Sequence, residues 1–182
     1  MAAPWGAKRT LHSQPHHESK RRSPAVSRVG ILMGSANDYE IMKAAEDALA
    51  ELGVSSEVRV ISAHRTPERL VRFLESAEDE DIGVVICGAG MSAHLAGVTA
   101  AHTTLPVLGV PIDASPLNGL DALLSTVQMP GGIPVATFGI GRSGAKNAGL
   151  FAAAILAGSD PELRKRLEQL RADQSAKVPE RP

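Results

Sequence analysis

The stretch RVGILMGSAND, residues 28–38, contains the pattern that runs through the whole chain. Its apolar run from Val29 to Met33 predicts a short buried strand, and Gly34 marks the point where that strand ends. Apolar residues then recur at helical spacing between Ile41 and Leu52. A buried strand followed by a helix is the repeating unit of α/β proteins.

The same unit repeats along the rest of the chain. Further strands are predicted at 55–60, 82–87, 107–110 and 133–138. Helices are predicted from Pro67 onward and near 93–102, 119–127, 144–157 and 160–172. Strands that alternate with helices form a parallel sheet with right-handed crossovers and helices on both faces. We therefore expect an α/β fold, built as a three-layer α/β/α sandwich.

Composition separates the two ends of the chain from this domain. Residues 1 to about 27 carry three prolines and several basic residues but almost no aliphatic ones. Such a stretch cannot bury enough apolar surface to offset the entropy lost on ordering. We expect a disordered N-terminal tail over 1–27, one domain over 28–174 and a C-terminal tail over 175–182.

Charge and hydropathy exclude several classes of function. The net charge is −1 and no basic face recurs along the domain, so nucleic-acid binding is not expected. No window approaches the length of a membrane span, and no apolar core of a secretory signal is present. A single cysteine, Cys87, excludes an internal disulfide. We expect a cytoplasmic protein without membrane association.

Ligands of parallel sheets bind at the carboxyl ends of the strands, so the segments after the strands are the candidates for a site. After the first strand, Gly34 lets the backbone approach a ligand closely. Ser35 and Asn37 offer neutral donors suited to a phosphate, and Asp38 offers an acceptor suited to ribose hydroxyls. The same residues also make ordinary helix caps, and the sequence alone leaves both interpretations open.

The second strand is followed by a hydroxyl, an imidazole and a guanidinium in close succession, at Ser62, His64 and Arg65. The fork of an arginine matches the geometry of a phosphate. A histidine, with an ordinary pKa of about 6.5, can give or take a proton near neutral pH. The alternative is a surface loop whose polar residues cap the next helix.

The third strand ends in two glycines that allow a flat ring to lie against the backbone, within Gly88, Ala89 and Gly90. His94 follows and could face the same cleft as His64, although a lone histidine at the start of a helix is more often structural. The run from Gly139 to Gly144 matches a dinucleotide-binding fingerprint. That fingerprint also needs a following strand with an acid at its end, which this chain lacks. A nucleotide cofactor is therefore not expected.

Taken together and in order, these motifs resemble those of the PurE family, the N5-carboxyaminoimidazole ribonucleotide mutases. The resemblance runs from about Arg28 to about Leu170. It rests on Gly-Ser-x-x-Asp, Ser-Ala-His-Arg-Thr-Pro, Gly-Ala-Gly-x-x-Ala-His-Leu, Leu-Gly-Val-Pro and Val-Gln-Met-Pro-x-Gly-Ile-Pro-Val. The chain departs from the family pattern at Asn37, where serine is frequent, and at Met91, where glycine is common.

The resemblance implies a flavodoxin-like, PurE-like catalytic domain and an isomerase of purine (IMP) biosynthesis that uses no metal and no cofactor. The reaction converts N5-carboxyaminoimidazole ribonucleotide to 4-carboxy-5-aminoimidazole ribonucleotide by decarboxylation and recarboxylation. The resemblance gives His64 the role of general acid/base. The ribonucleotide would be bound by Ser35, Asp38 and Arg65, with help at the phosphate from Ser62 and Asn37, a ring site along Gly88, Ala89 and Gly90, and support from His94.

Two other functions remain to be weighed against the mutase. A relative in the same family carboxylates aminoimidazole ribonucleotide directly with CO₂, but its motif typically has His-Lys, so Arg65 and Pro67 favour the mutase. A signalling receiver shares the fold, but it would need an acidic pair after the first strand, where this chain has Gly34 and Ser35.

The segment from Gly144 to Gly158 carries a single charge, on Lys146, and a helix so apolar must be buried on more than one side. Either a neighbouring subunit or the final helix at 160–172 would cover the side that the sheet does not. The resemblance to the family implies a homo-octamer, with active sites bordered by neighbouring subunits.

Overall fold

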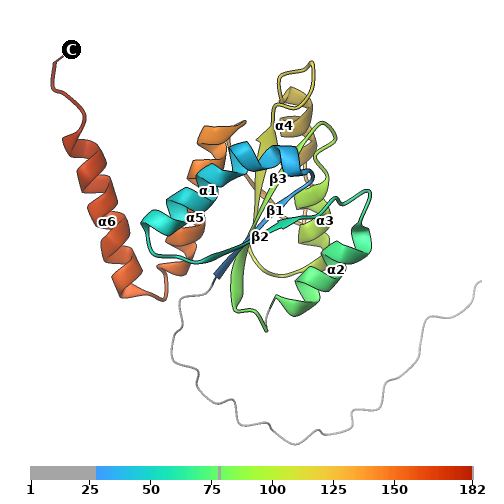
Figure 1. Ribbon diagram of the computed structural model, residues 1–182, viewed down its shortest axis with the longest axis horizontal. Coiled ribbons are helices and arrows are strands. Elements are labelled where there is room, and N and C mark those ends of the chain that lie inside the picture. Colours follow the sequence, from blue (N-terminus) through green and yellow to red (C-terminus); the bar gives the residue numbers. More distant parts are fainter. Residues whose placement is uncertain (1–27, 78, 182) are drawn as a thin grey trace, which may run out of the picture.

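Figure 1 shows a computed structural model of the chain, which describes residues 28–77 and 79–181. The tail predicted at 1–27 lies outside the described residues. Within the described ranges, no helix is both long and apolar enough to cross a membrane.

The centre of the domain is a parallel sheet in the order β2-β1-β3-β4-β5. This is the strand order of flavodoxin-like folds. The strands are β1 (Arg28–Met33), β2 (Ser56–Val60), β3 (Ile82–Gly90), β4 (Val107–Ile112) and β5 (Ala136–Thr137). The predicted three-layer sandwich is confirmed.

Helices cover both faces of the sheet (Figure 1). On one face lie α1 (Tyr39–Glu51) and α5 (Arg142–Leu156), and on the other lie α2 (Pro67–Ser76), α3 (Leu95–His102) and α4 (Leu120–Val127). The last helix, α6 (Pro161–Ala176), packs on α5 at the edge of the domain, and a single 3-10 turn, η1 (Ala36–Asp38), precedes α1.

The core consists of two apolar clusters, one on each face of the sheet. Successive side chains of a strand point to opposite faces, so β1 contributes to both clusters. Ile31 and Met33 lie in the cluster under α1 and α5, whereas Leu32 lies under α2 and α3. All three side chains are fully buried, as expected for the central strand of a sheet that is covered on both faces.

Several predicted boundaries differ from the structure by a few residues, and β3, for example, continues to Gly90 rather than 87. Two of the differences have a clear cause. The fifth strand was expected over 133–138 but comprises two residues, Ala136 and Thr137, because it is an edge strand that pairs only with Leu108 and Gly109 of β4. Pro134 has no N–H to donate to a ladder, which favours a late start of this strand. The last helix runs to Ala176 rather than 172, since no glycine or proline follows until Pro179.

One side of α5 is covered by α1, whereas the expected covers were a neighbouring subunit or the final helix. Six small residues of α5 are buried by packing against α1 and the sheet of the same chain: Gly144, Ala145, Ala148, Gly149, Ala152 and Ala153. A methyl group added at Gly149 would lie 2.7 Å from the carbonyl oxygen of Ala45, which shows how closely the two helices approach. The side of α5 that carries Ala154 and Phe151, which is 48% exposed, stays open within the described chain, so a neighbouring subunit there stays a prediction. On the buried side α6 is not the main cover.

Candidate active site

The site lies between β1 and β3, where the order in which the chain adds strands to the sheet reverses. From β1 the chain moves outward to β2, and it then returns to the other side of β1 to form β3. Helices that leave two such strands in opposite directions open a crevice at the carboxyl ends of the strands. A cavity of ≈ 490 Å³ occupies this crevice. Its lining comes from the segments that follow β1, β2, β3 and β4: Gly34, Ser35, Asp38, Ser62, Ala63, His64, Arg65, Ala89, Gly90, Met91, Ser92, His94, Leu95 and Ala114.

The segment after β1 both caps a helix and lines the cavity, so the two interpretations left open by the sequence hold together. The Ser35 N–H donates to Oδ2 of Asp38 at 2.9 Å, and the Asn37 N–H donates to Oγ of Ser35 at 3.3 Å. Burial raises the pKa of the Asp38 carboxyl above its usual value, while the Ser35 N–H and the positive charge of Arg65 act in the opposite direction. The Asp38 side chain is thus a buried acceptor beside a cation.

The segment after β2 is closed into a tight loop by one hydroxyl. Oγ1 of Thr66 accepts from the Ser62 N–H at 3.0 Å and lies 3.1 Å from the Ser62 carbonyl oxygen, to which it donates. The Thr66 N–H donates to the same carbonyl at 2.8 Å. This loop holds His64 and Arg65 at its tip, directly before α2 begins at Pro67.

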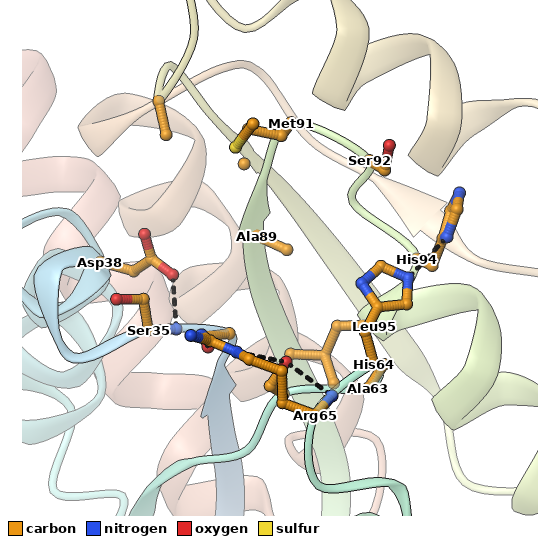
Figure 2. Close-up of a pocket in the computed structure, with 14 residues that line it drawn as sticks. Ser35, Asp38, Ala63, His64, Arg65, Ala89, Met91, Ser92, His94 and Leu95 are labelled. Atoms are coloured by element: carbon orange, nitrogen blue, oxygen red, sulfur yellow. Dashed lines mark hydrogen bonds between the residues drawn. The ribbon is translucent and has the colours of Figure 1, made fainter.

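Arg65 joins the ends of β1 and β2. Its Nε donates to Oγ of Ser62 at 3.3 Å, and its Nη2 donates to the carbonyl oxygen of Gly34 at 3.1 Å. Figure 2 shows its guanidinium beside Ser35, on the side of the cavity opposite the histidines. A guanidinium carries more N–H groups than these two contacts use, so it retains donors for an anion.

The two histidines meet across the cavity mouth. Nε2 of His64 lies 2.9 Å from Nδ1 of His94, and the rings stand nearly perpendicular, at 86° with centroids 5.0 Å apart (Figure 2). A hydrogen bond at this distance needs one proton between the two facing nitrogens. The other ring nitrogen of His64, Nδ1, has no hydrogen-bond partner among the described residues. It is the atom that this arrangement leaves for a substrate.

Most of the predicted site residues come together in the cavity, but two do not line it. Asn37 is exposed on η1. Gly88 is buried under α1, where any side chain would overlap Met42. The alternation of side chains along β3 is the signal that separates Gly88 from Ala89, because neighbouring residues of a strand face opposite sides.

Several residues at the site were not predicted from the sequence. Ala114 follows β4 and lines the cavity, as the rule of strand ends would have indicated. Met91 also lines it and has a backbone φ of 57°, in the left-handed region. A third residue, Ser125 of α4, lies outside the lining, but its Oγ accepts a hydrogen bond from the Ala93 N–H in the segment that carries His94. Nothing in the local sequence marks Ser125.

The glycines of the dinucleotide-like run have a packing role. A side chain at Gly144, at the start of α5, would overlap the backbone of Gly139. Gly141 has a φ of 77°, which a glycine adopts without strain. Among the described residues, no group of three histidine, cysteine or acidic side chains is placed to hold a metal ion.

This fold, with two hydrogen-bonded imidazoles, a guanidinium and a buried carboxyl at its strand ends, has the groups of an enzyme site that can bind an anionic ligand and move a proton. The AIR carboxylase family matches residues 28–177, and the chain belongs to this family.

Its relatives include three mutases from distant organisms. The N5-carboxyaminoimidazole ribonucleotide mutase of Bacillus subtilis is 56% identical over 143 residues, which cover 79% of this chain and 88% of the relative. The mutase of Escherichia coli K12 is 51% identical over 164 residues, 90% of this chain and 96% of the relative. The mutase of Pyrococcus abyssi is 54% identical over 148 residues, 81% and 84% of the two chains.

A similar fold is seen in a solved structure. The crystal structure of Treponema denticola PurE superposes with a TM-score of 0.76 at 29% identity, over 83% of this chain and 93% of that one.

Proposed function

We propose that this chain converts N5-carboxyaminoimidazole ribonucleotide into 4-carboxy-5-aminoimidazole ribonucleotide in purine (IMP) biosynthesis. The observation that carries the proposal is the pair of imidazoles 2.9 Å apart, in one cavity with an arginine and a buried carboxyl. Relatives that are 51–56% identical over most of their length bear the name of this mutase.

His64 exchanges the protons that the reaction requires. Loss of CO₂ from the exocyclic nitrogen needs a proton delivered to that nitrogen, and recarboxylation at ring carbon four leaves a proton on that carbon to be removed. One histidine that alternates between two protonation states serves both steps. Its Nδ1 faces the substrate while Nε2 stays bonded to His94, so the ring keeps its orientation as its charge changes.

The opposite side of the cavity binds the ribonucleotide. Arg65 meets the phosphate through its unused N–H groups, and the hydroxyls of Ser35 and Ser62 supply neutral donors beside it. Asp38 accepts from a ribose hydroxyl. The imidazole ring of the substrate then lies against Ala89 and Gly90, where the absence of larger side chains leaves room for it.

The decisive experiment supplies the unstable N5-carboxylated ribonucleotide to the purified protein and follows formation of the C4-carboxylated product. A parallel reaction supplies aminoimidazole ribonucleotide with CO₂. Product formed only in the second reaction would mean that the chain is the direct carboxylase, against what Arg65 and Pro67 indicate.

We further propose that the enzyme is a homo-octamer. The support is an exposed apolar stripe on and before α4, where four side chains at helical spacing are 46–61% exposed: Leu117, Leu120, Leu124 and Val127. Such a patch is unusual on a monomer. Light scattering coupled to size exclusion should give about 152 kDa, eight copies of 19.0 kDa. A fully active species near one subunit mass would refute the assembly.

A cytoplasmic location completes the proposal. The proposed substrate carries a phosphate, and a charged molecule does not cross a bilayer unaided. The enzyme should therefore work in the compartment where its substrate is made, which cell fractionation followed by the mutase assay would test.

A further inference from the structure

The segment between β3 and α3 is held in a strained conformation at the edge of the cavity. Met91 has a φ of 57°, a region that residues other than glycine adopt at a cost because the Cβ crowds the backbone. The Met91 side chain is 60% exposed, so burial of its apolar surface contributes little to hold the backbone there. Some other interaction must stabilise this conformation.

That interaction comes from one hydroxyl on α4. Oγ of Ser125 accepts a hydrogen bond from the Ala93 N–H at 3.0 Å and lies 3.4 Å from the carbonyl oxygen of Met91. Its single proton has nearer acceptors in its own helix, the carbonyl oxygens of Asp121 at 2.8 Å and Ala122 at 3.2 Å. Ser125 thus ties the Ala93 end of the strained turn to a helix that packs on β4.

His94 is the next residue along this segment. Its N–H donates to the Ser92 carbonyl oxygen at 2.8 Å, within the same turn, and its ring lies 2.9 Å from His64. A hydrogen bond weakens steeply once its atoms move apart by several tenths of an ångström. If the segment relaxed at Met91, the His94 ring would move with it and the bond to His64 would be lost.

We propose that Ser125 is a positioning residue, which holds the strained Met91–Ala93 turn and thereby sets His94 against His64. It does not line the cavity, so it acts on the substrate only through the histidines. The proposal rests on the mutase function for its kinetic readout, but its structural readout does not depend on that function.

The test begins with Ser125→Ala in the full chain. The kcat for the mutase reaction should fall by about 10- to 100-fold, the scale of a misplaced catalytic group, with little change in KM. Imidazole ¹⁵N NMR of the free protein should show that the hydrogen-bonded signals of His64 and His94 are altered. Ser125→Thr, which keeps the hydroxyl, should restore both readouts.

Ser76→Ala is the matched control. The Ser76 hydroxyl also donates to a carbonyl one turn earlier in its own helix, Phe73 at 3.0 Å, but it lies at the end of α2 away from the His64 loop. This variant should change neither kcat nor the imidazole signals. Should Ser125→Ala fail to fold, Ser125→Cys gives the same comparison, because a thiol is a much weaker acceptor.

A double-mutant cycle separates the positioning role from a general loss of stability. Glycine adopts a positive φ without strain, so in a Met91→Gly background the turn no longer needs the hydroxyl. Adding Ser125→Ala to Met91→Gly should then lower kcat by about twofold or less, a clear departure from additivity. A full loss in both backgrounds would overturn the proposal, as would normal kcat and unchanged imidazole signals in Ser125→Ala. A wild-type protein without mutase activity would instead refute the proposed function, and the NMR comparison would still test Ser125.

Discussion

Replacing Arg65 with alanine tests how the cavity binds its phosphate. The change removes the guanidinium and its bonds to Oγ of Ser62 and the carbonyl oxygen of Gly34. It keeps the bond at 3.2 Å from the residue 65 backbone N–H to Oγ of Ser62. The loop that carries His64 is closed by Thr66 and not by Arg65, so the catalytic histidine should stay in place.

The expected loss of binding affinity follows from the charges of the guanidinium and the phosphate. A hydrogen bond to a charged group contributes about 1.5–3 kcal/mol, so the ribonucleotide should bind roughly 10- to 150-fold more weakly. The corresponding nucleoside has no phosphate, and its affinity should hardly change. Titration calorimetry with the stable C4-carboxylated ribonucleotide and with its nucleoside measures the two losses side by side.

A second consequence concerns Asp38. The positive charge of Arg65 lowers the pKa of the Asp38 carboxyl, against the effect of burial. In Arg65→Ala that pKa should rise further, as measured by ¹³C NMR titration of the carboxyl.

An equal loss of affinity for nucleotide and nucleoside would refute the role of Arg65 at the phosphate and would mean that Arg65 serves only to hold the ends of β1 and β2 together.

Four further variants test the rest of the site and the fold. His64→Asn should lower kcat by about 10²–10⁴-fold, the usual contribution of a general acid/base, while the product still binds; a near-normal kcat would exclude His64 as the proton carrier. The raised pKa of Asp38 means that the native state binds its proton more tightly than the unfolded state, whose carboxyl has the ordinary value of 3.8. Urea unfolding should therefore show the stability of the wild type, relative to Asp38→Asn, falling as the pH rises from 3.8 through the raised pKa; a difference that does not vary with pH would contradict the shift. Gly149→Ala should destabilise the protein by about 1–3 kcal/mol, because the new methyl group would press on the Ala45 backbone, and an unchanged urea midpoint would refute the α1–α5 contact. Deleting residues 1–25 should leave kcat unchanged, since the cavity is already lined by described residues that lie at or beyond Gly34.

The fold and the centre of the site could be predicted because both depend on regular patterns. Short apolar runs that alternate with segments of helical periodicity predict a parallel sheet. The carboxyl ends of parallel strands lie together at one edge of that sheet. Ser35, His64 and His94 could therefore be expected at one edge of the sheet, although they are distributed over 60 residues of the chain. It could not give the contact between the two imidazoles, which depends on the rotamer of each ring.

The remaining features depend on packing between distant segments. Ser125 and Ala93 are 32 positions apart, and no periodicity relates a helix hydroxyl to a turn on another element. The cover of α5 by α1 depends on how closely two helices approach, and small residues such as Gly149 and Ala45 permit that approach without requiring it. For the same reason the apolar run of α5 was compatible with several neighbours, of which the structure shows one.

The buried thiol at the centre of the sheet gives the protein a natural probe of its own opening. Cys87, the only cysteine of the chain, lies on β3 and is 2% exposed. Burial raises the pKa of its thiol to about 12, so at neutral pH it carries almost no reactive thiolate. An alkylating reagent can therefore modify the native chain only when the sheet separates from its helices. The rate at which the unaltered protein is labelled, followed by mass spectrometry, would measure how often the sheet opens. A bound nucleotide that bridges β1, β2 and β3 should slow this labelling.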